Sequence, residues 1–170
     1  MTGYIRFLSV TFICLMSLTE VNAKRLPSVK LRNIAGKMID TATISNDGNP
    51  VIISFFALWC KPCLRELTAI ADVYDDWQQQ TGVKLIAVSI DDSRSTDKVR
   101  SEMNAREFGW DVLLDVNSDF KRAMNINQIP HTIILDGKGE IVWQHSSYTD
   151  GGEEEIKRVL LELSNRTNEE

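Results

Sequence analysis

Two cysteines separated by two residues, Cys60 and Cys63, form the pair in this chain whose spacing best suits chemistry. A disulfide between them would close a very short loop and remove little entropy from the unfolded chain, which disfavours a purely structural role. A structural zinc site needs four ligands, and the only histidines are His131 and His145. The spacing therefore favours a reversible dithiol–disulfide pair, with Cu(I) binding by the same sulfurs as the metal alternative.

The elements around the cysteines indicate how they are positioned. Residues 51–59, VIISFFALW, form an apolar run that predicts a strand buried on both faces. The next residues predict a helix that ends at Gly82. Its apolar side chains recur with the helical period: Leu64, Leu67, Ile70, Ala71 and Tyr74. Cys60 then lies at the helix N-terminus, where free N–H groups and the helix dipole favour a thiolate. We expect Cys60 to be the nucleophile and Cys63, one turn deeper, to be the resolving thiol.

The rest of the chain predicts one α/β domain over residues 24–170. A hairpin around Gly36 comes first, and two further strands and a final strand pair follow the buried strand, with helices between and after them. The helix that begins near residue 95 is expected to use Ser95 or Thr96 as its N-cap and to end at Gly109.

Residues 1–23 have the order of a secretory signal peptide: one basic residue, an apolar run, and the small residue Ala23. We expect cleavage after Ala23 and export, to the periplasm of a bacterium. The apolar run is shorter than the ~20 residues that span a bilayer, so stable membrane insertion is not expected, and an uncleaved anchor is the alternative. Cys14 lies inside this run and would be removed with it.

The composition excludes one class of partner. A chain of 170 residues with 43% hydrophobic content can form a core, and its net charge of −5 opposes binding to nucleic acid, which needs clustered Lys and Arg. We expect a monomer.

The motifs resemble those of the thioredoxin superfamily, and the resemblance covers most of residues 26–165. Two separated segments carry it, and their matching residues are Trp59, Cys60, Cys63, Ile129 and Pro130. The resemblance implies an α/β thioredoxin-like fold, in which helices flank a central mixed sheet. It also implies that Pro130 is a cis-proline, which begins the penultimate strand beside the sulfurs.

A closer likeness is to the exported subgroup that contains the TlpA and ResA proteins. The leader, residues 26–39 and the block 95–115 carry this likeness, which implies an N-terminal strand extension and a βα insertion before the cis-proline strand. Members of the subgroup often have a glutamate three residues after the second cysteine, where this chain has Glu66. The likeness suggests an acid/base that moves the proton of Cys63. The alternative is an exposed carboxylate that pairs with Arg65 or with solvent.

Three residues depart from the superfamily pattern or extend it. Cytosolic thioredoxins carry a buried aspartate where this chain has Ser54, and a helix-kinking proline where it has Thr68. His131 directly follows Pro130 and could carry a proton, because histidine titrates near neutral pH. Since side chains alternate across a strand, we expect His131 to point away from the sulfurs.

The resemblance implies a thiol-disulfide oxidoreductase of the cell envelope that reduces protein disulfides through a mixed disulfide on Cys60. Clients would dock near the active site, against Trp59, Lys61, Pro62, Ile129 and Pro130. An upstream thiol donor, bound to the membrane, would keep the protein reduced, and neither a metal nor an organic cofactor is required. Pro62 lies where reductants of the superfamily have proline.

Several alternatives use the same residues. The pair could form or isomerise disulfides instead of reducing them. A peroxiredoxin shares the fold, but Cys60 follows Trp59 and lacks the Pro/Thr-flanked setting of a peroxidatic cysteine. A copper-delivery module would add a histidine such as His131 as a ligand, and a redox-inactive binding domain would use neither sulfur.

Overall fold

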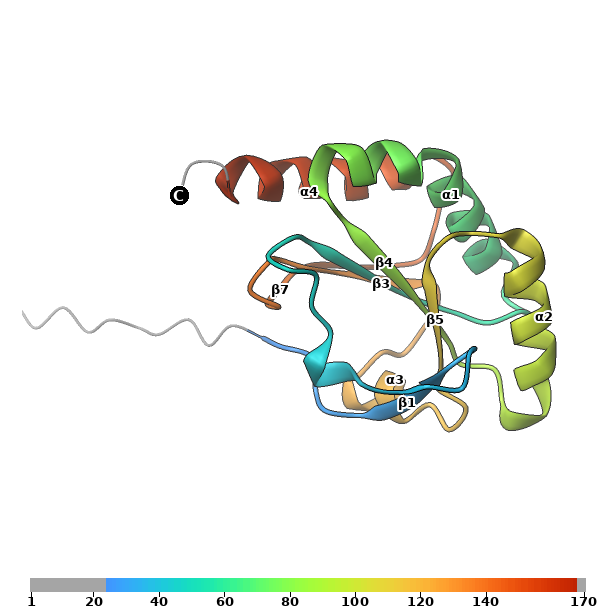
Figure 1. Cartoon of the computed structure of the whole chain (residues 1–170). Coiled ribbons are helices and arrows are strands. Elements are labelled where there is room, and N and C mark those ends of the chain that lie inside the picture. The colour runs from blue at the N-terminus through green and yellow to red at the C-terminus, as the bar shows by residue number, and fades with distance from the viewer. Residues whose placement is uncertain (1–23, 168–170) are drawn as a thin grey trace, which may run out of the picture.

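The computed structural model describes residues 24–167, which form a seven-stranded mixed sheet with helices on both faces (Figure 1). The strands lie in the order β2-β1-β5-β4-β3-β6-β7. Their bounds are β1 Lys30–Asn33, β2 Met38–Asp40, β3 Val51–Phe56, β4 Lys84–Ser89, β5 Asp111–Leu114, β6 His131–Leu135 and β7 Ile141–Ser146. The central mixed sheet flanked by helices is thus confirmed, while the predicted signal peptide, residues 1–23, lies outside the described residues.

The helices divide between the two faces of the sheet. Their bounds are α1 Lys61–Thr81, α2 Thr96–Arg106, α3 Asp119–Ala123 and α4 Glu153–Thr167. Helices α1 and α4 lie along one face (Figure 1), and Val99 and Met103 of α2 join the same core cluster. Helix α3 packs on the other face through Phe120.

Strand β3 lies near the centre of the sheet and leads directly to the cysteines. It is parallel to β4 and antiparallel to β6, and all of its side chains are buried. Val51, Ile53 and Phe55 belong to the core under α3, whereas Ile52 and Phe56 belong to the core under α1. Because both faces of the strand contact a core, its sequence is an almost continuous apolar run.

The N-terminal extension and the predicted insertion are both present. Strands β1 and β2 form an antiparallel hairpin, and β1 pairs with β5 so that Arg32 lies opposite Leu114. Strand β5, which follows α2, separates this hairpin from the parallel strands β4 and β3. A short 3₁₀ helix, Thr41–Thr43, leads from β2 back towards β3.

The predicted C-terminal end is confirmed for α1 and is wrong for α2. Helix α1 ends at Gly82, whose φ of 65° suits glycine, as expected. The predicted end of α2 at Gly109 is wrong, because Glu107 adopts the left-handed conformation (φ 51°) and ends the helix two residues earlier.

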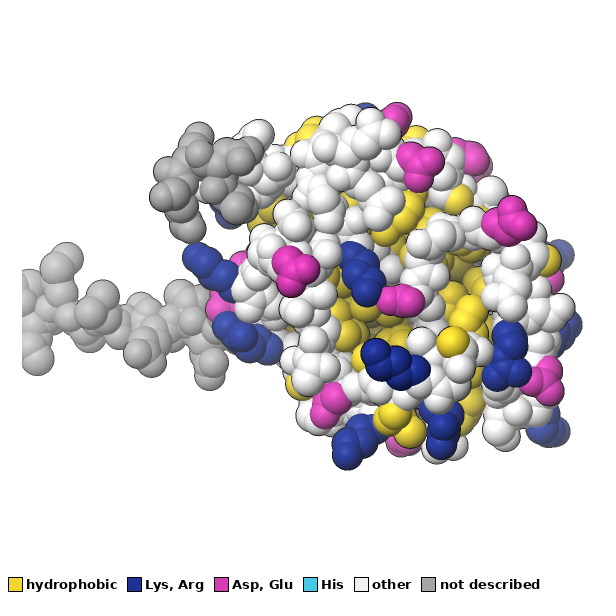
Figure 2. Space-filling view, in the orientation of Figure 1, with side chains coloured by type: hydrophobic (Ala, Val, Ile, Leu, Met, Phe, Trp, Pro, Cys, Tyr) yellow, Lys and Arg dark blue, Asp and Glu magenta, His cyan; other side chains and the backbone are white. Residues whose placement is uncertain are grey.

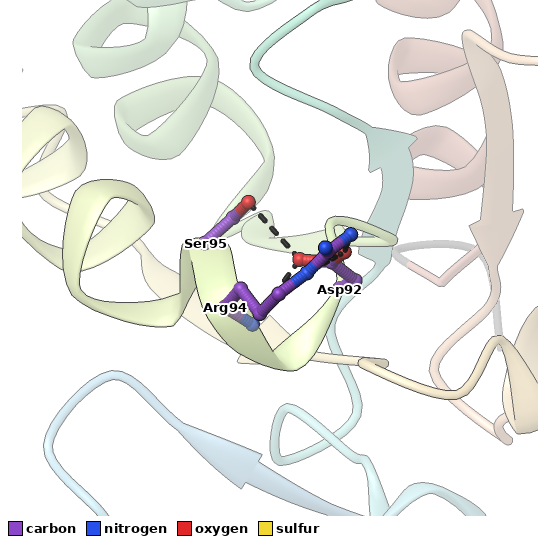
Figure 3. Close-up of polar contacts among 3 residues, drawn as sticks. All are labelled: Asp92, Arg94 and Ser95. Carbon is purple, nitrogen blue, oxygen red and sulfur yellow. Dashed lines mark hydrogen bonds and ion pairs between the residues drawn. The ribbon is translucent and has the colours of Figure 1, made fainter.

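The N-cap position of α2 is as predicted, since Ser95 occupies it. Its side chain makes no capping hydrogen bond, however, and its hydroxyl donates to Asp92 Oδ1 at 3.2 Å (Figure 3). Asp92 instead caps the preceding 3₁₀ helix, Ser93–Ser95, by accepting from the Arg94 amide at 3.1 Å. Its other oxygen accepts from the Arg94 guanidinium at 2.6 and 3.0 Å. The helix therefore follows a capped turn instead of starting with its own side-chain cap.

The surface mixes charges of both signs. On the face seen in Figure 2, basic and acidic side chains are interspersed with hydrophobic ones, and the described residues form no continuous basic surface there. An extended basic surface is what binding to a phosphate backbone requires.

Candidate active site at the N-terminus of α1

The two cysteines form a disulfide at the start of α1, with their Cα atoms 5.3 Å apart. Cys60 is the N-cap residue, and its Sγ accepts a hydrogen bond from the Cys63 amide at 3.3 Å. Cys63 is fully buried, whereas Cys60 retains 6% of its exposure. Lys61 and Pro62 are the first two residues of the helix, where a missing N–H has no cost. Of the two sulfurs, Cys60 is the one placed for attack from outside.

A tight turn presents the residue before the first cysteine. The Cys60 amide donates to the carbonyl oxygen of Ala57 at 3.0 Å, so residues 57–60 form one turn between β3 and α1. Trp59 lies in this turn and is 69% exposed, the most of any large hydrophobic side chain among the described residues. An exposed aromatic ring next to the sulfurs offers an apolar contact to another molecule.

Glu66 follows Cys63 by three residues in α1 and lies in the core and not on the surface. It is 4% exposed, and its carboxyl oxygens accept from Thr132 Oγ1 at 3.0 Å and from Ser54 Oγ at 3.3 Å. The alternative partner Arg65 instead lies 3.8 Å from Asp150 on the surface. The alternative, an exposed Glu66 that pairs with Arg65, is therefore wrong.

The environment of Glu66 changes its acidity. Burial raises the pKa of Glu66 from 4.5 to about 7, although the hydrogen bonds from Thr132 and Ser54 lower it in part. A carboxyl group with such a pKa can both accept and release a proton near neutral pH.

The cis-proline segment forms another part of the site. The Ile129–Pro130 peptide bond is cis, as the resemblance implied, and it immediately precedes β6. Pro130 is buried, and its carbonyl oxygen accepts from the Ser147 amide at 2.9 Å. Ile129 is half-buried and packs against the cores on both faces of the sheet.

His131 points to the other face of the sheet, as expected. It lies opposite Phe55 in the β3–β6 register, whereas Thr132, the next residue, lies opposite Ser54. The imidazole Nδ1 is 2.6 Å from Ser146 Oγ, and burial lowers the pKa of His131. His131 is thus separated by the sheet from the carboxyl group of Glu66.

Within residues 24–167, no group of three or more His, Cys, Asp or Glu side chains is arranged to hold a metal ion. No helix in that part of the chain has both the length and the hydropathy to cross a membrane.

The sequence of this chain matches a known family over most of its length, from residue 23 to residue 144. The chain belongs to the AhpC/TSA family. This AhpC/TSA protein is 30% identical over 124 residues to the sporulation thiol-disulfide oxidoreductase A of Bacillus subtilis (strain 168), a match that covers 72% of this chain and 73% of that one. It is 27% identical over 116 residues to the thiol-disulfide oxidoreductase ResA of the same strain, a match that covers 68% of this chain and 62% of ResA. The match thus spans less than two thirds of the length of ResA.

A solved structure is similar to this AhpC/TSA protein in both sequence and fold. The solution structure of an uncharacterized thioredoxin-like protein from Porphyromonas gingivalis is 53% identical, with a TM-score of 0.75. The match covers 82% of this chain and 92% of the other. The thioredoxin-like fold that the motifs implied is confirmed.

Sequence reasoning did not find the partners of Glu66. Ser54 stands out in the sequence only as a departure from the superfamily pattern, and Thr132 belongs to no recognised motif. These two residues face each other across β3 and β6, and the carboxyl group of Glu66 lies between their hydroxyl groups. Ser54 within the apolar run of β3 and Thr132 next to the apolar residues 133–135 of β6 are the signal that could have found them.

Proposed function

We propose that this protein is a thiol-disulfide oxidoreductase that reduces disulfides in client proteins. The single observation that carries the proposal is the Cys60–Cys63 disulfide at the N-terminus of α1, the helix that also holds the buried Glu66. The names of the relatives support the same activity.

The reaction would proceed through two exchanges. In the reduced protein the Cys60 thiolate attacks one sulfur of a client disulfide, which forms a mixed disulfide and releases the other client sulfur as a thiolate. Cys63 then loses its proton, attacks Cys60 Sγ and releases the second client sulfur. The client gains two electrons, and the protein is left with the Cys60–Cys63 disulfide.

Glu66 would act in the second exchange. Cys63 is fully buried and must lose a proton before it can attack, and water has little access to it. The carboxylate of Glu66, one helical turn further along α1, would accept that proton. Its raised pKa of about 7 suits this role, because a base with a very low pKa would hold the proton too weakly.

Clients would bind over the exposed edge of the site. Trp59 supplies an exposed apolar surface, and an extended client segment would run past Ile129 and Pro130 in the manner of an added strand. Lys61 is exposed next to Cys60 and would contact the same segment, with Pro62 beside it.

The direction of electron flow depends on the reduction potential. Pro62 lies where reductants of the superfamily carry proline, while the positive charge of Lys61 favours the thiolate to a modest degree. We propose that the protein reduces its clients in the cell and that a membrane-bound thiol donor supplies it with electrons. Disulfide formation or isomerisation by the same pair is the second candidate.

We place the activity in the cell envelope, and this rests on residues 1–23, which have the composition of a secretory signal. A fusion of residues 1–30 to an enzyme that is active only after export would test the location.

Trapping of clients would test the mechanism. In Cys63→Ser, the mixed disulfide on Cys60 cannot be resolved, so clients should remain attached and should be released by dithiothreitol. Cys60→Ser should lose insulin reduction completely, and the double variant Cys60→Ser/Cys63→Ser should trap nothing. Clients attached equally to the double variant would contradict the assignment of Cys60.

Two further measurements distinguish a reductase from the alternative functions. A Cys60/Cys63 potential near about −270 mV agrees with a reductase, whereas one near about −120 mV would indicate an oxidant. Consumption of hydrogen peroxide by the reduced protein at enzymatic rates would show a peroxidase instead.

A further inference from the structure

A buried carboxylate outside the cysteine helix holds the turn that carries the active site. Asp91 follows β4 and is 6% exposed. Its Oδ2 accepts from the amide of Leu58 at 2.9 Å and from Ser89 Oγ at 2.9 Å, while its own amide donates to Ser89 Oγ at 3.1 Å. Asp91 therefore joins the segment after β4 to the turn after β3.

The hydrogen bond to Asp91 comes from a central residue of the turn. Residues 57–60 form the turn, Leu58 and Trp59 are its central residues, and the bond from the Cys60 amide to the Ala57 carbonyl closes it. The amide of Leu58 has its partner in Asp91, outside the turn. Leu58 is thus fixed from β4, and Trp59 and Cys60 follow it directly.

The backbone explains why these two segments meet. Strands β3 and β4 are parallel and in register from Val51 and Lys84 to Phe56 and Ser89. One further bond, from the Ile90 amide to the Phe56 carbonyl at 2.9 Å, extends the ladder beyond both strands. The carboxyl ends of the two strands therefore leave the sheet side by side.

No cation compensates the charge of Asp91. Among the ion pairs of residues 24–167, none includes Asp91, and the nearby Arg94 is held by both of its contacts to the Asp92 carboxylate (Figure 3). A buried negative charge is screened less than an exposed one and disfavours a second negative charge close by. The cation nearest to Cys60 in the chain, Lys61, is exposed and faces solvent.

We propose that Asp91 is a positioning residue that fixes the turn of Trp59 and Cys60, and that its charge makes the Cys60 thiolate less stable, which favours the reducing direction. A less stable thiolate destabilises the dithiol form relative to the disulfide, so the potential becomes more negative. The proposal rests on the proposed function only in taking Cys60 as the attacking sulfur.

The variant Asp91→Asn tests the charge. Asparagine keeps an oxygen that can accept from the Leu58 amide but has no charge. In equilibrium with oxidised and reduced glutathione, the protein dithiol and one oxidised glutathione give the protein disulfide and two reduced glutathiones. We expect the constant of this equilibrium to fall by about three- to tenfold in Asp91→Asn, and the pKa of Cys60 to fall with it.

The matched control is Asp92→Asn, which makes the same change one residue later. Asp92 is exposed and already paired with Arg94, so its variant should shift the glutathione equilibrium by less than about twofold. An equal shift in both variants, or none in Asp91→Asn, would overturn the proposed effect of the charge. A purely structural role of Asp91 would lower the thermal stability of both redox forms without moving this equilibrium.

A second variant tests the positioning. Asp91→Ala leaves the Leu58 amide without its partner, so the turn should loosen and kcat/KM for insulin reduction should fall about tenfold. Asp91→Asn should keep kcat/KM within about threefold of the unchanged protein. Equal losses in both variants would overturn the positioning role, whereas a wild-type protein that does not reduce insulin at all would contradict the proposed function and not the role of Asp91.

Discussion

Glu66 shows how one residue can acquire an unusual acidity from ordinary neighbours. Its helix brings it to the inner face of the sheet, where Ser54 and Thr132 are the only polar side chains in the described parts of β3 and β6 that donate to it. Two neutral hydroxyl groups offset only part of the cost of burying a charge, and no cation is paired with this carboxyl group in residues 24–167. The protonated form is therefore favoured up to about pH 7.

The raised pKa of Glu66 predicts a pH-dependent stability. Between pH 4.5 and about 7, Glu66 is protonated in a larger fraction of folded molecules than of unfolded ones. The free energy of unfolding therefore falls as the pH rises through this window. Across this window the free energy of unfolding falls by about 3 kcal/mol in total. Urea unfolding of the oxidised protein from pH 4 to pH 8 would measure it. In Glu66→Gln this contribution should disappear, which would leave the variant more stable than the parent at pH 8.

The control for this prediction is Glu162→Gln, which removes a carboxylate on the exposed side of α4, where it pairs with Arg158. Its stability should follow the parent across the pH range. A Glu66→Gln protein with the same pH slope as the parent would contradict the prediction. The same variant should also release a client from a preformed mixed disulfide more slowly, with the first exchange unchanged.

At the residue scale the sequence predicts the cysteine pair and the cis-proline well and the surroundings of Glu66 poorly. Cys60, Cys63 and Pro130 are evident from spacing and motif alone. The burial of Glu66 is not, because it depends on the register that places Ser54 opposite Thr132, and these residues are distant in the chain. A pattern within one helix cannot reveal such a register.

Among the elements, α1 and β4 are joined by one buried hydroxyl group. Tyr74 of α1 is 5% exposed, and its hydroxyl oxygen accepts from the Leu85 amide of β4 at 2.9 Å and from Gln78 Nε2 at 3.2 Å. Leu85 is fully buried, so its amide has no access to water as a substitute partner. The bond therefore fixes the active-site helix relative to the sheet.

Tyr74→Phe should lower the free energy of unfolding by about 1–3 kcal/mol, because the buried amide of Leu85 loses its partner. Urea unfolding at pH 7 would measure the change. Tyr148→Phe is the matched control, since the Tyr148 hydroxyl bonds to Glu153 in a half-buried position, and its cost should stay within about 0.5 kcal/mol. An equal decrease in the free energy of unfolding in the two variants would show that the hydrogen bond to β4 stabilises the fold no more than the bond between Tyr148 and Glu153.

The order and type of the elements follow from the sequence, and so does the start of α2, but its C-terminal end and its capping contacts do not. Helical and strand periods differ clearly, so the apolar run of β3 and the stripe of α1 could be predicted. Ser95 lies at the predicted N-cap, but its hydroxyl donates to Asp92 and no side chain caps the helix. Several residues near that boundary could serve as caps, and only their relative geometry decides.

For the whole molecule, the order of the strands predicts where the fold opens first. Strands β3 and β4 are paired on both sides, whereas β2 and β7 lie at the two edges of the sheet. Amides in β3 and β4 should exchange with solvent only through global unfolding, and those of β2 should exchange at least about tenfold faster. Hydrogen exchange of the oxidised protein would measure this. Protection of β2 equal to that of β3 would indicate that the hairpin and the parallel strands unfold as one unit.

The overall architecture was predictable because separate motifs agreed. The cysteine segment and the Ile129–Pro130 segment each suggest the same superfamily, and the hairpin and the block 95–115 account for the remaining strands. The sheet order itself, with β5 between β1 and β4, could not be read from periodicity, because pairing between distant strands leaves no local pattern.

The chain enters the fold at the end remote from its disulfide. The Lys24 carbonyl accepts from the Ile141 amide at 2.7 Å, and the register leads from Ile141 through Leu135 to Val51, the first residue of β3. Cys60 follows the opposite end of that strand, which is about 20 Å long. A solid support attached directly at Lys24 would therefore lie at the end of the fold opposite to the sulfurs.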